Sequence, residues 1–296
     1  MILSVGEILV DMIGTKTDRG FFYERKAGGA PFNVACTIKK MGGDCAFIGS
    51  VGCDLVGKFL IDTVKDLGVD GEVVQHATRN TTLAFVDLDS SGERSFCFYR
   101  KHTADYDMPS IDDKYFEKAS IIHFGSLMLS EEEGRQYLER EMERARQAGK
   151  KISFDVNFRE DIFPDRQTAV AIYKKFMQYA DIIKFSKDEV ELFTQEYVEE
   201  ISQSKLVCIT LGKDGSSWMY QGRTNSVSSI SVKPMDTTGA GDAFYGAFLT
   251  KIDGKQWNDE LFNQACRFGN VCGALNTTKR GAVDAIPALE QVNQLL

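Results

Sequence analysis

Two kinds of segment alternate along most of this 296-residue chain, and the alternation constrains its fold more than any other feature. Short apolar runs typical of buried strands occur at 2–5, 45–52, 120–126, 151–157, 181–186 and 206–212. Segments with helical periodicity lie between them, at 32–43, 57–69, 131–150, 169–180 and 188–197. This order predicts a single doubly wound α/β domain over 1–296, in which a mostly parallel sheet carries helices on both faces. Ligands of such sheets bind at the carboxyl ends of the strands.

One stretch interrupts this rhythm. Residues 82–100, TLAFVDLDSSGERSFCFYR, form two strand-like runs joined by the turn residues at 89–92. The pattern predicts a β-hairpin. It is either a flap over the ligand edge of the sheet or an ordinary edge hairpin, and the segment alone does not distinguish the two.

Composition excludes several classes of function. The net charge of −8 and the pI near 5.1 argue against a nucleic acid or an anionic membrane surface as the main partner. The seven cysteines include no C-x-x-C pair, which fits scattered thiols in a reducing cytoplasm better than disulfides or a zinc site. The N-terminus is a poor signal peptide, because Glu7 and Asp11 interrupt its apolar run.

The segment 236–248, DTTGAGDAFYGAF, combines two acids with a Gly-Ala-Gly turn and a helix-like run. Gly239 and Gly241 allow successive backbone N–H groups to converge, and the positive end of the following helix favours an anion there. Asp242, held ionised by that end, could accept the proton of a hydroxyl that attacks phosphorus. It could equally be a first-turn acid that only balances the helix dipole.

A second glycine cluster, GGAPFNVA at 28–35, enters another predicted helix. Paired glycines let a ligand approach the backbone, and Asn33 offers a donor and acceptors for hydroxyls. With both signatures present, the chain resembles the ribokinase-like carbohydrate kinases over its whole length. GEILVD at 6–11, ITLGKDG at 209–215 and KRGA at 279–282 fit in order. Within that family it is most similar to bacterial fructokinases, because of DVNFR at 155–159 and of GERSFCFYR followed by Ala104 and Asp105.

The resemblance implies ATP-dependent phosphorylation of a sugar. It assigns the catalytic base to Asp242 and the anion hole to the amides of Gly239, Ala240, Gly241 and Asp242. It places Asp11, Gly28, Gly29, Asn33, Tyr99, Arg100 and Arg159 at the sugar. A small β-sheet lid would comprise about 12–26 and 82–104, and relatives that pair through their lids make a homodimer possible.

The resemblance also implies sites for ATP and for two kinds of metal ion. Lys184, Ser186, Glu189, Thr210, Gly212, Gly215 and Asn270 would bind ATP, with Glu189 reaching Mg²⁺ through water. Ser186 stands where the family has Asn, which weakens its own assignment. Asp236 and Thr238 match positions that hold a monovalent cation, here expected to be K⁺.

Each assignment has a structural alternative. Asp11, Arg100, Arg159 and Lys184 could be surface charges, and Asp236 could end a strand.

The expected substrate is fructose, phosphorylated at its terminal hydroxyl. The alternatives are 2-keto-3-deoxygluconate as substrate of the same fold, or a sugar- or nucleotide-sensing protein without turnover. Asp105 favours fructose, because it could neutralise Arg100 and leave no cation for a sugar carboxylate.

Overall fold

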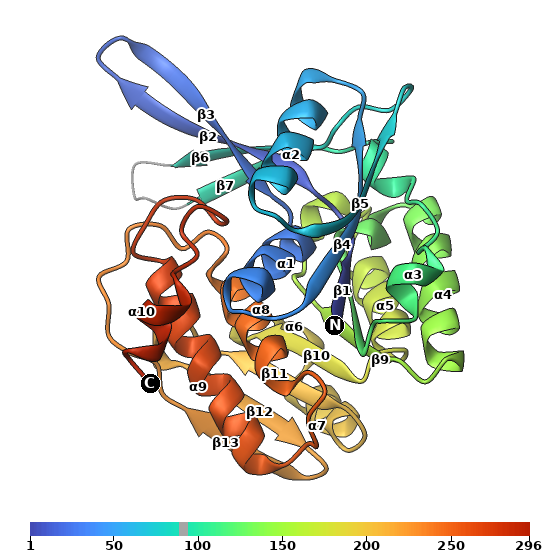
Figure 1. Ribbon diagram of the computed structural model, residues 1–296, viewed down its shortest axis with the longest axis vertical. Helices are drawn as coiled ribbons and strands as arrows, with labels where there is room; N and C mark the ends of the chain where they lie inside the picture. Colours follow the sequence, from blue (N-terminus) through green and yellow to red (C-terminus); the bar gives the residue numbers. More distant parts are fainter. Residues whose placement is uncertain (89–93) are drawn as a thin grey trace.

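The computed structural model describes residues 1–88 and 94–296, with side chains outside 87–96, and contains two β-sheets (Figure 1). The larger sheet has nine strands in the order β13-β12-β11-β10-β9-β8-β1-β4-β5. Neighbours from β11 to β5 pair in parallel, whereas β12 pairs antiparallel with both β11 and β13. Their bounds are β1 Ile2–Val5, β4 Cys45–Gly52, β5 Asp70–His76, β8 Ile121–Phe124, β9 Lys151–Asp155, β10 Ile182–Ser186, β11 Leu206–Thr210, β12 Ser216–Tyr220 and β13 Arg223–Val227.

Two hydrophobic cores cover the two faces of this sheet, because successive side chains of each strand point to opposite faces. Ile182 packs into one core and Ile183 into the other. The first core contains residues of α1 (Ala30–Lys40), α2 (Leu55–Asp66), α8 (Ala240–Ile252), α9 (Asp259–Asn276) and α10 (Leu289–Asn293). The second contains residues of α3 (Asp113–Phe116), α4 (Glu132–Gln147), α5 (Arg166–Met177), α6 (Lys187–Phe193) and α7 (Gln195–Ser202). The predicted doubly wound fold is confirmed.

One predicted helix is two helices. The pattern at 188–197 suggested a single helix, but α6 ends at Phe193 and α7 begins at Gln195. Between them Thr194 has a positive φ of 75°, which breaks the helical path, and its hydroxyl accepts the amide of Tyr197 at 3.4 Å.

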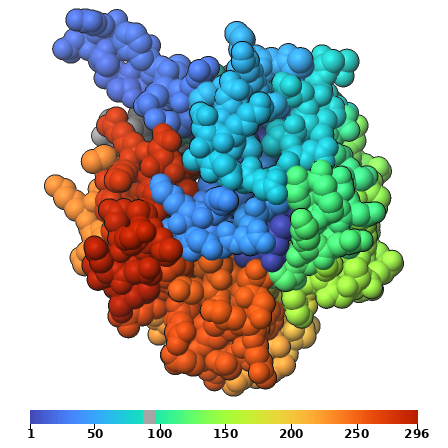
Figure 2. Space-filling model, viewed as in Figure 1, coloured from blue at the N-terminus to red at the C-terminus, as the bar shows by residue number. Residues whose placement is uncertain are grey.

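The smaller sheet stands apart from the larger one, and its β2–β3 hairpin projects from the body (Figures 1 and 2). Its strand order is β3-β2-β6-β7, with β2 Leu9–Thr17, β3 Gly20–Gly28, β6 Leu83–Leu88 and β7 Arg94–Tyr99. The antiparallel pairing of β6 with β7 confirms the predicted hairpin, while its turn at 89–92 lies outside the described residues. Within the described ranges, no helix combines the length and the apolarity that a membrane span requires.

Candidate active site

Two cavities adjoin at the start of α8, by the carboxyl ends of the strands. The smaller cavity, of about 320 Å³, is lined by residues of the small sheet, of α1 and of the turn that begins α8. The larger, of about 550 Å³, is lined by the loops after β11 and β13 and by α8 and α9. Thr237 and Gly241 line both cavities. A group held in one cavity can therefore meet a group held in the other at this turn.

Asp242 lies at this junction, in the first turn of α8, and lines the smaller cavity. Its Oδ2 accepts a hydrogen bond of 2.8 Å from the side-chain amide of Asn33. Burial, together with the nearby Asp155, raises the pKa of Asp242 to about 6, while Lys184, Asn33 and Arg159 act in the opposite direction. The shift is upward, contrary to the expectation from the helix end alone, but the carboxylate is still mostly ionised at pH 7.

The turn before Asp242 depends on glycine. Gly239, which precedes α8, has a left-handed φ of 73°, and a Cβ built on it would lie 2.6 Å from the Cβ of Ala282. The amides that follow have no partner within the first turn of an α-helix and carry the positive end of its dipole. The predicted turn and its helix are thus present. Position 239 requires glycine for two reasons, its left-handed backbone and the lack of room for a Cβ.

Lys184 brings a positive charge beneath this turn. Its Nζ lies 3.4 Å from a Cβ built on Gly241, and it contacts the two carboxylate oxygens of Asp155 at 2.8 and 2.9 Å. Burial acts against the charge, yet the pKa of Lys184 is raised because Asp155 and Glu189 face it. Lys184 also lines the smaller cavity, so it is not an exposed surface charge.

Glycines also shape the wall of the smaller cavity formed by β2 and α1. A Cβ on Gly28 would lie 2.3 Å from Oδ2 of Asp11, and Gly29 has a φ of 108° beside the carbonyl of Glu7. Of the residues predicted to bind the sugar, Asp11, Gly29, Asn33 and Arg159 line this cavity, whereas Gly28 only makes room for Asp11.

Tyr99 and Arg100 do not line the cavity, in contrast to the sequence-based expectation. Phe98 lines it instead, and Tyr99 points to the other face of β7, where it is 61% exposed and packs against Phe85. Arg100 is buried, and its Nη2 contacts Asp105 at 2.7 Å. The predicted neutralisation of Arg100 by Asp105 is confirmed.

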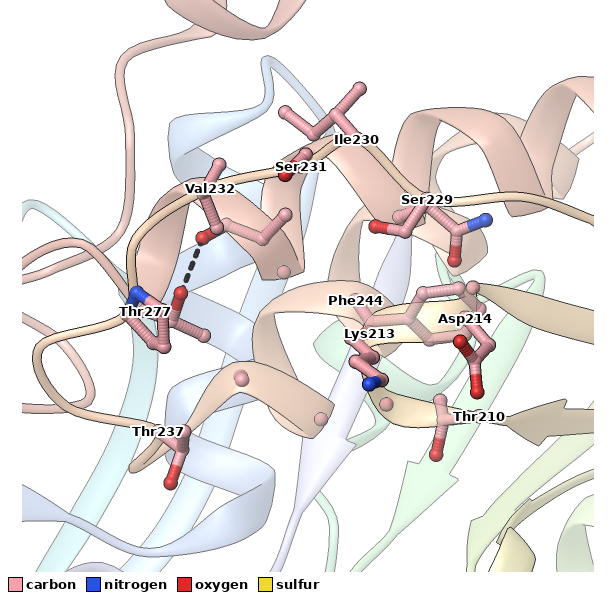
Figure 3. A pocket seen from close by; sticks show the side chains of 18 residues that line it. Thr210, Lys213, Asp214, Ser229, Ile230, Ser231, Val232, Thr237, Phe244 and Thr277 are labelled. Atoms are coloured by element: carbon pink, nitrogen blue, oxygen red, sulfur yellow. Dashed lines mark hydrogen bonds between the residues drawn. The ribbon is translucent and has the colours of Figure 1, made fainter.

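The larger cavity combines polar loops with apolar walls. Figure 3 shows Ser229, Ile230, Ser231 and Val232 on one side of it and Thr210, Lys213 and Asp214 on the other. Thr210, Gly212, Gly215 and Asn270, which were predicted to bind ATP, line this cavity. Asn270 also donates to the carbonyl of Val227 at 2.8 Å, which holds the loop after β13 against α9. A largely apolar cavity with a few placed polar groups is typical of a small-molecule site.

Ser186 and Glu189 line neither cavity. Ser186 caps α6, and the carboxylate of Glu189 accepts the amides of Ser186 at 2.6 Å and Phe158 at 2.7 Å. Glu189 thus joins the start of α6 to the loop after β9. Because both its oxygens already accept hydrogen bonds, it suits contact with a metal ion through water better than direct ligation.

Asp236 ties two loops together and does not end a strand. Its two oxygens accept the amides of Thr238 at 2.7 Å and Gly281 at 3.0 Å, and the residue is buried. A buried carboxylate that joins two loops places negative charge beside their backbone carbonyl groups, and oxygen donors of this kind suit a hard cation. Over 1–88 and 94–296 no three His, Cys, Asp or Glu residues gather into a metal-binding group.

Several residues of the two cavities escaped sequence reasoning. Asn157, with a positive φ of 34°, lines the smaller cavity, and the loop at 229–234 lines the larger one. Asn157 lies inside the quoted DVNFR motif, so its position after a buried strand could have indicated it. The loop at 229–234 carries no motif.

Comparisons with known proteins agree with this geometry. The family model described as pfkB family carbohydrate kinase matches residues 1–289. Fructokinase-1 of Zea mays is 36% identical, covering 100% of this chain and 97% of the relative. A structure of Xylella fastidiosa fructokinase with bound ATP has a TM-score of 0.92 and 31% identity, covering 99% of this chain and 97% of the other. A Vibrio cholerae O395 fructokinase double mutant with fructose, ADP and potassium bound has a TM-score of 0.89 and 33% identity, with coverages of 99% and 97%. The chain belongs to the pfkB family of carbohydrate kinases.

Proposed function

We propose that this protein transfers the terminal phosphoryl group of ATP to the terminal hydroxyl of fructose, giving fructose 6-phosphate and ADP. The observation that carries the proposal is the position of Asp242 where the two cavities meet, one step past the Gly-Ala-Gly turn. Similarity to fructokinases, two of them solved with ATP or with fructose and ADP, supports the same substrates here.

Each part of the junction has a defined task in this reaction. The ionised carboxylate of Asp242 accepts the proton of the sugar hydroxyl as its oxygen attacks phosphorus. Asn33 orients that carboxylate through the 2.8 Å hydrogen bond. The amides of Gly239–Asp242 and the ammonium of Lys184 stabilise the negative charge of the transferring group. ATP would occupy the larger cavity and fructose the smaller one.

The charges around the smaller cavity favour a neutral sugar. Two acids, Asp11 and Asp242, and two bases, Arg159 and Lys184, line it, and Lys184 is also paired with Asp155. Arg100 is paired with Asp105 and does not line the cavity. A carboxylated sugar such as 2-keto-3-deoxygluconate would thus meet as many acids as bases, and no excess of positive charge among these lining residues would stabilise its carboxylate.

Mg²⁺ and K⁺ complete the proposal. Mg²⁺ would neutralise charge on the phosphates of ATP, and Glu189 would contact it through water. Asp236, with the loop that contains Thr238, would hold K⁺. The bound ion would keep this loop, which leads into the Gly239–Asp242 anion hole, in one position. The potassium in the Vibrio cholerae structure supports the latter assignment.

The small sheet, whose four strands include most of the predicted lid at about 12–26 and 82–104, would exclude water from the reacting groups. Asp11 and Phe98 of this sheet already line the sugar cavity.

A row of aromatic rings crosses the small sheet, with centroid distances of 5.0–5.3 Å between neighbours. It consists of Phe21, Tyr23, Phe85 and Tyr99, and three of these four residues are more than 40% exposed. This exposed row would suit the lid of a second copy, and sedimentation of the wild type and Tyr23→Ser tests such a homodimer.

The cytoplasm is the proposed location, because all seven cysteines are free thiols, as expected in a reducing compartment.

The activity itself is tested with a panel of neutral and acidic sugars, measuring ADP release and identifying the product by NMR. Phosphorylation of fructose at its terminal hydroxyl supports the proposal. Binding of sugar and ATP without any turnover would indicate a sensing protein instead.

A further inference from the structure

Glu7 is a buried acid whose carboxyl has no hydrogen-bond partner. It lies between β1 and β2, where the chain passes from the large sheet to the small one, and has no exposed surface. Neither carboxylate oxygen makes a hydrogen bond. A Cβ on Gly125 would lie 2.7 Å from its Oε2, so that glycine leaves the room that the carboxyl occupies.

Such a group destabilises the fold. A buried polar group without a partner has lost its hydration without compensation, and an apolar side chain of similar size would be more favourable. Burial raises the pKa of Glu7 to about 8, so the carboxyl is mostly protonated at pH 7, and nearby Arg100 reduces this shift. Stability therefore does not account for an acid at this position.

Arg100 complements Glu7 from the small sheet. Its Nη2 contacts Asp105, its guanidinium lies 4.6 Å from the ring centroid of Tyr106, and its Nε and Nη1 have no hydrogen-bond partner. Burial lowers the pKa of Arg100, but Asp105 and Glu7 are among the groups that raise it overall. Two buried groups with unused donors and acceptors thus lie within electrostatic range of each other, one in the link between the two sheets and one just after β7 of the small sheet.

Hydrogen bonds connect the base of the small sheet to Arg100 through Asp105. Asp105 accepts the hydroxyls of Thr82 at 2.7 Å and Thr103 at 2.6 Å, next to the start of β6 and the end of β7. Arg100 follows Phe98 by two residues, and Phe98 lines the sugar cavity. The position of Arg100 therefore affects how the β6–β7 hairpin presents Phe98 to the sugar.

We propose that Glu7 is a positioning residue for the sugar, which acts through Arg100 to fix the base of the β6–β7 hairpin against the large sheet. The inference rests on the proposed sugar kinase activity. It assigns Glu7 no contact with the sugar or with ATP, since Glu7 lines neither cavity.

The test compares Glu7→Met with Glu7→Gln at pH 7. Glu7→Met removes the polar group, and we expect the KM for fructose to rise about tenfold while the KM for ATP stays within about twofold. Its Tm should stay equal or rise, because an unpartnered buried acid is gone. Glu7→Gln imitates the protonated carboxyl and should keep the fructose KM within about threefold of the wild type.

The matched control is Glu141→Met. Glu141 is another buried acid, on α4, but it contacts Arg140 at 3.1 Å and Arg144 at 3.3 Å and lines neither cavity. We expect this variant to lose Tm and to keep both KM values, because it breaks a buried ion pair far from the sugar. If Glu7→Met does not fold, Glu7→Leu removes the same polar group with a shorter apolar side chain and should raise the fructose KM in the same way.

A double-mutant cycle with Arg100→Met identifies the path of the effect. If Glu7 acts through Arg100, the double variant should have the same fructose KM as Arg100→Met alone. Additive effects on KM, or a Glu7→Met variant with unchanged fructose KM, would overturn the inference. A wild-type protein that phosphorylates no sugar would instead overturn the proposed function.

Discussion

The side-chain amide of Asn33 donates a 2.8 Å hydrogen bond to Oδ2 of Asp242, joining α1 to α8 across 209 residues of sequence. The two glycine-rich motifs of the chain thus meet at one carboxylate. Because Asn33 also lines the sugar cavity, a sugar bound there lies beside the group that would deprotonate it.

Replacing Asp242 tests its role as the base. Asp242→Asn should lower kcat by about 10²–10⁴-fold, the usual contribution of a general base, and should leave the Kd for ATP nearly unchanged. Steady-state kinetics and calorimetry measure the two effects. Asp62→Asn, at an exposed position on α2, is the matched control and should behave as wild type. Near-normal turnover by Asp242→Asn would remove this residue from the mechanism.

The pH dependence follows from the same carboxylate. A base must be ionised, and the pKa of Asp242 is about 6. Activity should therefore be full above that pH and fall about tenfold per unit well below it. Asn33→Ala removes a hydrogen bond that lowers this pKa, so the acid limb of kcat/KM should move to higher pH. An unmoved or lowered limb in this variant would contradict the assignment.

Alanine substitutions at two glycines with left-handed backbones distinguish the effect of backbone strain from the effect of steric crowding. Gly239 has a φ of 73° and Gly254 a φ of 67°, but a Cβ meets Ala282 at 2.6 Å only at Gly239, with nothing within 4 Å at Gly254. Gly254→Ala should lower the free energy of unfolding by about 1 kcal/mol with normal kcat. Gly239→Ala should lower it further and reduce kcat at least about tenfold, because the anion hole moves. Equal effects of both variants on kcat would mean that the turn does not take part in the reaction.

Removal of ions tests the two metal assignments. Activity should require Mg²⁺ and should rise with K⁺ in a buffer that lacks other monovalent cations. In Asp236→Asn the stimulation by K⁺ should weaken, because the carboxylate between the two loops has lost its charge. Full activity of the wild type without K⁺ would show that the monovalent site is absent or unimportant.

Much of the fold followed from the sequence because strands and helices alternate with clear periodicity. The turn at Gly239–Asp242 and the cluster at Gly28–Asn33 were predictable because their chemistry is local. Tyr99 was not, because a strand presents alternate residues to opposite faces and the sequence does not say which face meets the cavity. Glu7 escaped notice because its burial depends on where Gly125 and Arg100 lie, which only the tertiary structure determines.

The ratio of kcat/KM for fructose to that for 2-keto-3-deoxygluconate, measured side by side, tests the central claim most directly. Arg100 is neutralised by Asp105, and the charges around the sugar cavity are balanced. We therefore predict a ratio of at least about 10, or roughly 1.4 kcal/mol of transition-state preference for the neutral sugar. A ratio of one or below would contradict the fructokinase proposal, while the kinase family and the role of Asp242 would stand.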